Sequence, residues 1–170
     1  MTSKKIREAR ISDASQLIDL QMKLSIQTKY MMREMDEVIS DESVQEDRLK
    51  SAINNERMKY WVIEIESKIV GYLIVNSRNL KRVKHIAEFV IGIDQEYWGL
   101  GFGRELIGQM LEWSSEMDLK RLELGVVEEN KRAVNLYESF GFKVEGKKIS
   151  DHYIGNNKYL NTLIMAKILE

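Results

Sequence analysis

Hydrophobic and polar positions along the first third of the chain predict a short strand followed by two helices. Residues Ile6–Arg10 can form the strand, and Ser12-Asp13 offers an N-cap for a helix whose apolar residues recur at helical spacing. Asp41 or Ser40 can cap the second helix, which ends near Asn54-Asn55. The methionine-rich segment between the two helices has no clear period.

The pattern changes at Tyr60 to short apolar runs that are typical of strands. Trp61–Ile65 and Ile69–Asn76 flank the polar segment Glu66-Ser67-Lys68, so they predict an antiparallel hairpin. The elements expected after this hairpin are a strand at His85–Ile93, a helix carrying Leu106 to Trp113, a strand at Arg121–Val127, a helix from Asn130 to Gly141, and a strand pair formed by Phe142–Glu145 and Tyr159–Ile168.

This order of elements predicts an α/β (α+β) fold with a single mixed, mostly antiparallel sheet flanked by helices. The strand–helix–strand unit from His85 to Val127 requires one central parallel pair, because a crossover helix joins parallel strands. The 170 residues suit one domain spanning residues 1–170, and 44% hydrophobic residues are enough for a core. Neither an internal repeat nor a linker is visible in the sequence.

Composition and charge exclude several classes of function. The chain has no cysteine, which excludes disulfides, thiolate zinc sites and a cysteine nucleophile, and we expect no metal. The 26 basic and 27 acidic residues give a net charge of -1, which predicts no general attraction to nucleic acid. The longest apolar run, Ile69–Val75, is far shorter than the ~18 residues of a membrane span, and the N-terminus lacks an apolar signal region. We therefore expect a cytoplasmic protein that contacts no membrane.

Glycines provide the first indication of chemistry, because half of the ten lie between Gly92 and Gly108. Gly99, Gly101 and Gly103 stand between an expected strand and the first turn of an expected helix. A helix N-terminus carries unpaired N–H groups and a partial positive charge, so it binds phosphate oxygens well. Missing Cβ atoms let a phosphate approach the backbone closely.

Three phosphate-binding designs and one turn without a ligand are the alternatives for this loop. A Walker loop is excluded, because Gly103-Arg104-Glu105 stands where Gly-Lys-Ser/Thr is needed. A Rossmann loop needs G-x-G-x-x-G, whereas the spacing here is G-x-G-x-G. Glu123 has the spacing of a ribose-binding acid, but it lies inside a strand, and antiparallel strands precede the unit. A pyrophosphate loop of a third kind and a plain glycine-rich turn remain.

Two sequence blocks resemble the GCN5-related N-acetyltransferases. The first, Ile93-x4-Trp98-Gly99-Leu100-Gly101-Phe102-Gly103, is similar to their acetyl-CoA motif Q/R-x-x-G-x-G/A with an aliphatic residue ahead of it. The second, Asn130-x-x-Ala133-x-x-Leu136-Tyr137-x3-Gly141-Phe142, is similar to the signature N-x-x-A-x-x-L-Y-x-x-x-G-F on the next helix. The order of elements also matches. Trp98 departs from the pattern, which has Gln or Arg there; core packing and a contact with the loop or cofactor both stay open for it.

The resemblance implies acetyl-CoA as co-substrate, bound at a V-shaped split between two parallel strands. The strand that ends at Ile91-Gly92-Ile93 would pair its backbone with the pantetheine amides, and the N–H groups of the glycine loop would hold the pyrophosphate. Gly92 fits a bulge, a close backbone approach or simple packing, whereas Asn130 fits a helix cap, a pantetheine contact or both. The cofactor-binding residues implied are Ile91, Gly92, Ile93, Trp98, Gly99, Leu100, Gly101, Phe102, Gly103, Arg104, Asn130, Ala133 and Tyr137.

Acetyl transfer to an amine needs a base for the ammonium group and an acid for the leaving thiolate. Tyr137 matches the family's tyrosine, whose phenol would protonate or hydrogen-bond the sulfur; without the motif it would be a buried tyrosine on an apolar helix face. Glu88 is the predicted base, acting through water, because a carboxylate in a half-buried strand is unusual. His85 and His152 are the alternatives.

The predicted reaction moves an acetyl group to a primary amine of a small molecule or peptide by direct attack in a ternary complex. A run of acids can steer a cationic amine toward the site, or it can simply form a solvated face. These acids are Glu34, Asp36, Glu37, Asp41, Glu42, Glu46 and Asp47. A non-catalytic acyl-CoA-binding or sensing module of the same fold is the main alternative, and a Rossmann-type nucleotide-binding domain is another. A monomer and a homodimer both stay open.

Overall fold

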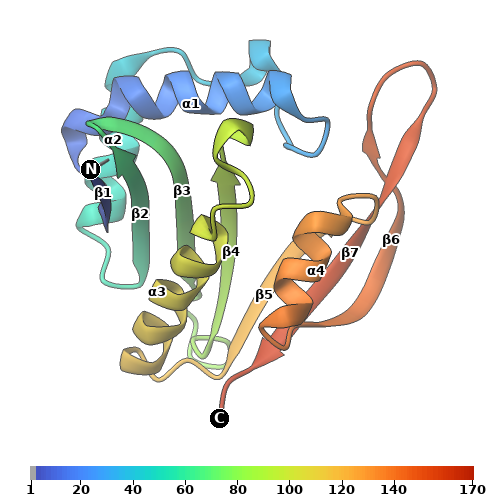
Figure 1. Ribbon diagram of the computed structural model, residues 1–170. Helices are drawn as coiled ribbons and strands as arrows, with labels where there is room; N and C mark the ends of the chain where they lie inside the picture. The colour runs from blue at the N-terminus through green and yellow to red at the C-terminus, as the bar shows by residue number, and fades with distance from the viewer. Residues whose placement is uncertain (1–2) are drawn as a thin grey trace. The chain divides into compact units, whose positions relative to one another are not determined.

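The computed structural model describes residues 3–170, which form seven strands and four α-helices (Figure 1). The strands are β1 (Lys4–Glu8), β2 (Met58–Ile65), β3 (Lys68–Ser77), β4 (Ile86–Ile93), β5 (Arg121–Val127), β6 (Lys143–Tyr153) and β7 (Tyr159–Ile168). The helices are α1 (Ala14–Gln27), α2 (Glu42–Ile53), α3 (Phe102–Glu116) and α4 (Lys131–Ser139), with short 3-10 turns η1 (Ile11–Asp13), η2 (Met35–Glu37) and η3 (Gln95–Tyr97). Every element expected from the sequence is present, and only β6 differs greatly in length.

The hydrogen-bonded order of the strands is β1-β2-β3-β4-β5-β7-β6, which makes one mixed sheet. β4 and β5 are parallel, with Ile86 opposite Arg121 and Glu88 opposite Glu123. The pairs β1–β2, β2–β3, β5–β7 and β6–β7 are antiparallel. The predicted fold class, with a parallel pair inside a mostly antiparallel sheet, is therefore confirmed.

The chain divides into two compact units. The first contains the residues up to Asn76 together with Val90–Glu112, and the second contains Ser77–Phe89 together with Trp113–Glu170. The boundaries between the units fall within β4 and α3, so each of these elements contributes residues to both. Among the helices between residues 3 and 170, none is long and apolar enough to cross a membrane.

The core of the first unit combines side chains from α1, α2, β2 and β3. Leu17, Leu20 and Leu24 recur at helical spacing along α1, and each is at most 4% exposed. They belong to one cluster with Leu49 of α2 and other buried residues of the strands. One apolar stripe of α1 therefore faces this core, as the helical period predicts. The predicted cap of α2 is confirmed as well, since the Asp41 carboxylate accepts the Ser43 N–H at 2.9 Å.

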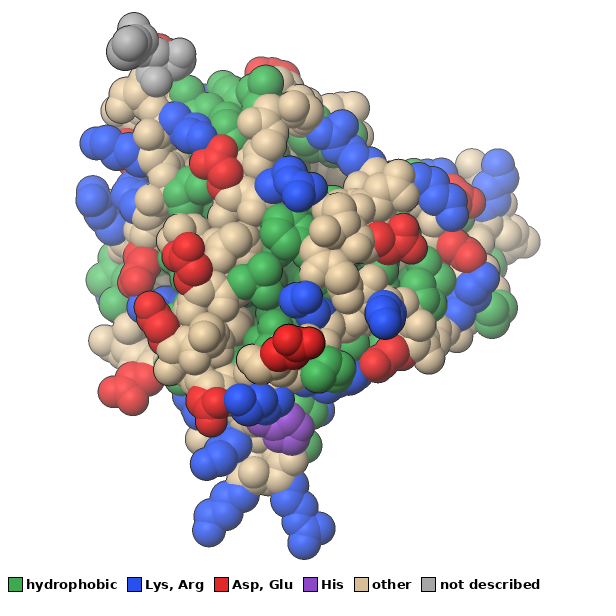
Figure 2. Space-filling model, turned by 60° about the horizontal axis from the view of Figure 1, so that its bottom comes forward, with side chains coloured by type: hydrophobic (Ala, Val, Ile, Leu, Met, Phe, Trp, Pro, Cys, Tyr) green, Lys and Arg blue, Asp and Glu red, His purple; other side chains and the backbone are tan. Residues whose placement is uncertain are grey.

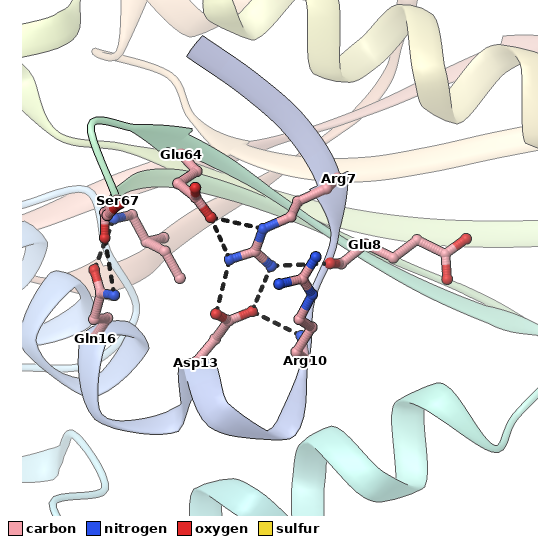
Figure 3. A network of polar contacts seen from close by, with 8 residues as sticks. Arg7, Glu8, Arg10, Asp13, Gln16, Glu64 and Ser67 are labelled. Carbon is pink, nitrogen blue, oxygen red and sulfur yellow. Dashed lines mark hydrogen bonds and ion pairs between the residues drawn. The ribbon is translucent and has the colours of Figure 1, made fainter. Parts of the chain in front are cut away.

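Arg7 of β1 joins three segments of the first unit through an ion-pair network (Figure 3). Its guanidinium donates to both carboxylate oxygens of Asp13, at 2.7 and 2.9 Å, and to Glu64 of β2 at 2.8 Å. Asp13 also accepts the Arg10 backbone N–H at 2.7 Å. Asp13 does precede α1, as an N-cap should, but its side chain makes no capping hydrogen bond. The carboxylate instead attaches the start of α1 to β1 and β2.

The second unit shows the expected alternation on β5 and an unexpected length of β6. Leu122, Leu124 and Val126 are buried, as a period of two predicts. β6 continues beyond the predicted end at Glu145 as far as Tyr153. It is the last strand of the sheet and most of its residues are exposed, so no apolar alternation marks it in the sequence. The predicted bounds of this strand were therefore wrong.

Candidate functional site

The glycine-rich loop leads directly into α3 in the first unit. Gly99 and Gly101 have φ angles of +81° and +84°, and no atom lies within 4 Å of a Cβ built at either position. The Glu105 N–H donates to the Gly101 carbonyl at 3.1 Å, so the helical hydrogen bonds begin there. The N–H groups of Phe102 and Gly103 belong to the first turn, where a helix offers no internal acceptor. Open space at the glycines and first-turn N–H groups are what a phosphate-binding loop requires.

Aromatic and charged contacts within the first unit hold this loop in place. The Trp98 indole N–H donates to the Ile93 carbonyl at 2.8 Å, which ties the start of the loop to the end of β4. The rings of Tyr97 and Phe102 stack with centroids 6.4 Å apart. Lys4 of β1 bonds Glu105 at 2.6 Å and lies 5.2 Å from the Phe102 ring centre. Trp98 is thus held by its hydrogen bond to the last residue of β4.

Asp94, the first residue after β4, is 1% exposed, and both of its carboxylate oxygens accept hydrogen bonds. Its carboxylate accepts from the Lys23 ammonium at 2.7 Å, from the Gln27 amide at 2.9 Å and from the Glu96 N–H at 3.2 Å. Burial alone would raise the pKa of Asp94, but the hydrogen bonds from Gln27 and Lys23 outweigh it and hold the pKa below 3.8. Gln27 also accepts the Gln95 N–H at 3.0 Å. Asp94 therefore connects α1 to the turn η3 that opens the glycine loop.

Gly92 is a site of close packing in β4. A Cβ built on it would lie 2.8 Å from Leu24 Cδ1 and 2.9 and 3.1 Å from Cε1 and Cζ of Tyr72. Real Cβ atoms do not approach other atoms so closely without displacement of a neighbour. Of the roles open to this glycine, simple packing is therefore the one observed, because the side chains of Leu24 and Tyr72 occupy the space beside it.

The second sequence block forms a helix in the second unit with a defined cap at each end. At the start of α4, the Asn130 side chain accepts the Ala133 N–H at 3.3 Å, so its capping role is confirmed. At the other end Gly141 has a φ of +85°, its N–H donates to the Glu138 carbonyl, and the Phe142 N–H donates to the Tyr137 carbonyl. This is a Schellman cap, for which glycine is the favoured residue. The spacing of the block thus fixes both ends of a helix that carries Tyr137.

Tyr137 belongs to an aromatic cluster in the second unit. Its ring lies 5.8 Å from Phe89 of β4 and 6.0 Å from Phe142, both in edge contacts, and the residue is 6% exposed. Burial raises the pKa of the Tyr137 phenol, so it keeps its proton. Its hydroxyl makes no hydrogen bond with the part of the chain that the structure describes, yet it is not sealed from solvent. A neutral phenol O–H is therefore held in a fixed place and available as a donor.

Glu88 lies on β4 in the second unit with its side chain 61% exposed. Its carboxylate accepts a hydrogen bond from Arg78 at 2.5 Å, and Arg78 also contacts Glu123 of β5 at 2.9 Å. Consecutive strand residues point to opposite faces, so Glu88 and Phe89 do not share a face. Because Phe89 contacts Tyr137, the predicted base and the predicted acid belong to opposite faces of this strand.

Charged side chains of the second unit pair with one another across neighbouring strands. Glu123 also accepts from Arg121, which in turn donates to Glu145 of β6. Figure 2 shows acidic and basic side chains interspersed over the face in view. Of the two alternative bases, His85 is exposed directly before β4 and His152 is half-buried in β6.

The region that matches a known protein family includes both sequence blocks. A model of the acetyltransferase (GNAT) family matches residues 25–142. The chain belongs to this family. It is therefore a GNAT N-acetyltransferase, an acyltransferase, and the resemblance of the two motifs is confirmed.

Three relatives of this GNAT enzyme illustrate the range of similarity. A GNAT-family acetyltransferase structure from Streptococcus pneumoniae has 28% identity and a TM-score of 0.92, covering 99% of this chain and 100% of that one. The L-amino acid N-acetyltransferase AaaT of Escherichia coli is 28% identical over 65% of this chain and 68% of its own length. The Vibrio cholerae spermidine N-acetyltransferase structure with CoA and spermine has 26% identity and a TM-score of 0.79, covering 97% and 95% of the two chains. The first four curated relatives match over 60–68% of their length.

Most of the acidic run in this GNAT enzyme has local structural partners. Glu34 and Glu37 form a reciprocal capping box around η2, and Asp41 caps α2. Glu46 and Asp47 both contact Lys50 on the same helix face. These contacts account for five of the seven acids without a ligand, and they favour the solvated-face interpretation of the run.

Sequence reasoning missed two residues that contact the motif segments, Tyr72 and Asp94. Tyr72 lies within a strand whose residues are almost all buried, so no alternation distinguishes it. The Asp94 contacts with Lys23 and Gln27 join positions far apart in the chain. The sequence did contain a usable signal for Asp94, because it is an acid directly after an apolar strand and before the glycine loop. Its partners Lys23 and Gln27 are four residues apart and therefore share a face of α1.

Proposed function

We propose that this enzyme transfers the acetyl group of acetyl-CoA to a primary amine by direct attack within a ternary complex. The observation that carries the proposal is the fixed, protonated Tyr137 phenol with no hydrogen-bond partner among residues 3–170. In this mechanism the amine nitrogen forms a bond to the thioester carbon, and the bond from that carbon to the CoA sulfur breaks. The Tyr137 O–H gives its proton to the departing sulfur, and the nitrogen loses a proton that returns the phenolate to a phenol through solvent. The products are an amide and CoA thiol.

The glycine loop is the proposed binding site for the pyrophosphate of acetyl-CoA. The positive φ angles and open Cβ space of Gly99 and Gly101 support this assignment, as do the first-turn N–H groups of α3. We assign the pantetheine arm to the backbone of Ile91, Gly92 and Ile93, with Asn130 and Ala133 as further contacts. The remaining proposed contacts are Trp98, Leu100, Phe102, Gly103 and Arg104. The capping bond of Asn130 uses one lone pair of its side-chain oxygen and leaves the amide donors for a ligand.

Glu88 is the proposed base, taking the ammonium proton through a water molecule. A lysine-like amine has a pKa near ~10.4, so it must lose a proton before its lone pair can attack. The exposure of Glu88 gives water access to its carboxylate, and Arg78 holds the side chain in place.

The acceptor we propose is a small amine or an amino-terminal peptide. L-Amino acids and spermidine are named for two of the relatives, and both present a primary amine. A panel with polyamines, aminoglycosides, amino acids and short peptides, read out as CoA release from acetyl-CoA, identifies the class that this chain uses.

The decisive experiment for the catalytic role replaces Tyr137 with phenylalanine. We expect kcat to fall about 10²–10⁴-fold while the Kd for acetyl-CoA is retained, because only the proton donor is lost. Tyr153→Phe is the matched control, since that tyrosine is 57% exposed on β6. Unchanged turnover in Tyr137→Phe contradicts the acid role, and binding of acetyl-CoA without turnover of any amine by the natural chain supports a sensing module instead.

Glu88→Gln tests the base, with Glu123→Gln as its control because both acids contact Arg78. We expect kcat/KM of the Glu88 variant to fall at neutral pH and to approach that of the natural enzyme at high pH, where the amine is already neutral. Equal effects of the two substitutions, or a fall that is independent of pH, contradict the base role.

A further inference from the structure

Tyr72 places the hydroxyl end of its ring against the strand that carries the proposed thioester arm. The residue lies on β3 in the first unit and is 4% exposed. Its Cζ atom, which bears the hydroxyl, is 3.1 Å from the position of a Cβ at residue 92, and Cε1 is 2.9 Å from it. Glycine is thus required at position 92 so that this phenol can lie beside the backbone of β4.

A second buried tyrosine shows what is unusual about this hydroxyl. Tyr60 packs edge-on against Tyr72, with ring centres 5.9 Å apart, and its hydroxyl is sealed from solvent without a hydrogen bond. The Tyr72 hydroxyl likewise makes no hydrogen bond with residues 3–170, but it is not sealed. A polar group on a buried ring therefore opens toward solvent beside Gly92. The N–H of a ligand can replace a water molecule at such a hydroxyl and keep its hydrogen bond.

The protonation state of this phenol suits contact with an amine. Burial raises the pKa of Tyr72 to about 12, while the positive charge of Arg33 acts in the opposite direction. The group is therefore neutral at physiological pH, with one O–H to donate and lone pairs that accept an N–H. An amine that donates an N–H to this oxygen has its own lone pair directed elsewhere, which attack on a carbonyl carbon requires.

We propose that Tyr72 is an acceptor-binding residue, whose hydroxyl accepts an N–H of the attacking amine beside Gly92. The inference rests on the proposed function, because Gly92 belongs to the segment assigned to the pantetheine arm. The phenol orients the nitrogen and exchanges no proton with it, so no additional chemical step is required. It acts on the amine, whereas Tyr137 acts on the sulfur.

The test compares Tyr72→Phe with Tyr60→Phe, two variants that each remove one hydroxyl from the same pair of rings. With an amine that the natural enzyme acetylates, we expect Tyr72→Phe to raise the acceptor KM about 3- to 10-fold, the loss of one hydrogen bond. The KM for acetyl-CoA and the melting temperature stay unchanged. Tyr60→Phe changes neither KM. An unaltered acceptor KM in Tyr72→Phe overturns the inference. Equal changes of the acceptor KM in both variants also overturn it, because a structural role alone would change the KM of both variants together.

A binding measurement separates failure of this inference from failure of the proposed function. Calorimetric titration of spermidine and of L-phenylalanine into the protein with CoA present does not depend on turnover. Amine binding that weakens in Tyr72→Phe but not in Tyr60→Phe supports the inference even when the natural chain acetylates nothing, which contradicts only the proposed function. Turnover by the natural chain with equal amine binding in both variants overturns the inference alone. If the natural chain shows no turnover and binds no amine, both the inference and the proposed function are overturned.

Discussion

The ammonium of Lys23 lies 2.7 Å from the carboxylate of Asp94, a residue that is only 1% exposed. The two residues belong to α1 and to the segment that opens the glycine loop. Lys23 also contacts Glu96 at 2.7 Å, but that carboxylate is 65% exposed. One lysine therefore has a buried partner and an exposed partner only two residues apart. Substitution of each acid in turn separates the effect of burial from that of charge.

Asp94→Asn is expected to weaken both folding and cofactor binding. The amide places N–H donors toward the Lys23 ammonium and removes a buried ion pair, which costs about 2–4 kcal/mol of unfolding free energy. The turn that precedes Trp98 loses its ion pair with α1, so we expect the KM for acetyl-CoA to rise about tenfold with a smaller change in kcat. Urea denaturation and steady-state kinetics measure the two effects.

Glu96→Gln is the control for this prediction, because it removes the exposed partner of the same lysine. Surface ion pairs contribute roughly 0–1 kcal/mol, so stability and acetyl-CoA KM should stay close to those of the natural enzyme. Similar losses in the two variants would show that the loop does not depend on the buried carboxylate.

Acid is expected to destabilise the first unit through Asp13. Burial alone would raise the pKa of Asp13, but hydrogen bonds from Arg7 and the Arg10 N–H outweigh it and lower the pKa below 3.8. The unfolded chain therefore binds this proton at a higher pH than the folded chain. The stabilisation is complete above about pH 5 and is lost as the pH falls below 3.8 toward the folded pKa.

Asp13→Asn checks the assignment of this pH dependence. We expect it to cost about 2–4 kcal/mol at pH 7, since Arg7 keeps Glu64 as its ion-pair partner but loses Asp13, and to flatten the fall in stability between pH 5 and pH 3. Asp47→Asn is the control, because Asp47 is 77% exposed and pairs only with Lys50 among the described residues. An acid-induced fall that is as steep in Asp13→Asn as in the natural chain places the responsible carboxylate elsewhere.

Local rules of sequence predicted the caps of this protein well and its long-range contacts poorly. Asp41, Asn130 and Gly141 were placed correctly because a cap depends on groups within four residues, all visible in the sequence. The family was indicated by the resemblance of the two blocks to its motifs, and the second block consists of a helix with its two caps. The type and order of the strands followed from their periods, except where the exposed edge strand β6 has none.

Contacts between distant segments did not follow from any period. Tyr72 and Gly92 meet across neighbouring strands, and both are buried, so neither breaks the apolar pattern around it. The face occupied by Glu88 was predictable from alternation, but its bond to Arg78 was not, because a loop separates them. The motif segments can thus be found from the sequence, whereas the residues that hold them in place need the structure.

Gly92→Ala tests the close contact beside the proposed acceptor site. Its Cβ would lie 2.8 Å from Leu24 Cδ1 and 2.9 Å from the Tyr72 ring, and the ring cannot bend away as an alkyl end can. We expect a loss of about 1–3 kcal/mol in unfolding free energy and a raised acceptor KM, because the phenol is displaced. Gly146→Ala, also in a strand but with open space, is the control. A variant at position 92 with natural stability and kinetics would contradict the packing argument.

The same substitution, glycine to alanine, should have opposite effects at Gly101 and Gly108. Neither added methyl group meets any atom within 4 Å, so the difference depends on the backbone alone. Gly101 has a φ of +84°, where an alanine costs about 1–2 kcal/mol, and the strained loop should also bind acetyl-CoA more weakly. Gly108 lies inside α3, where alanine is favoured over glycine by about 0.8–1 kcal/mol.

Thermal unfolding and acetyl-CoA titration of the two single variants measure this difference. We expect Gly108→Ala to melt at a higher temperature with unchanged acetyl-CoA affinity, and Gly101→Ala to melt lower with reduced affinity. A Gly101 variant that binds acetyl-CoA normally would mean that the loop reaches its binding conformation without the left-handed backbone. Because the two substitutions are chemically identical, an effect of the methyl group itself would appear equally at both positions.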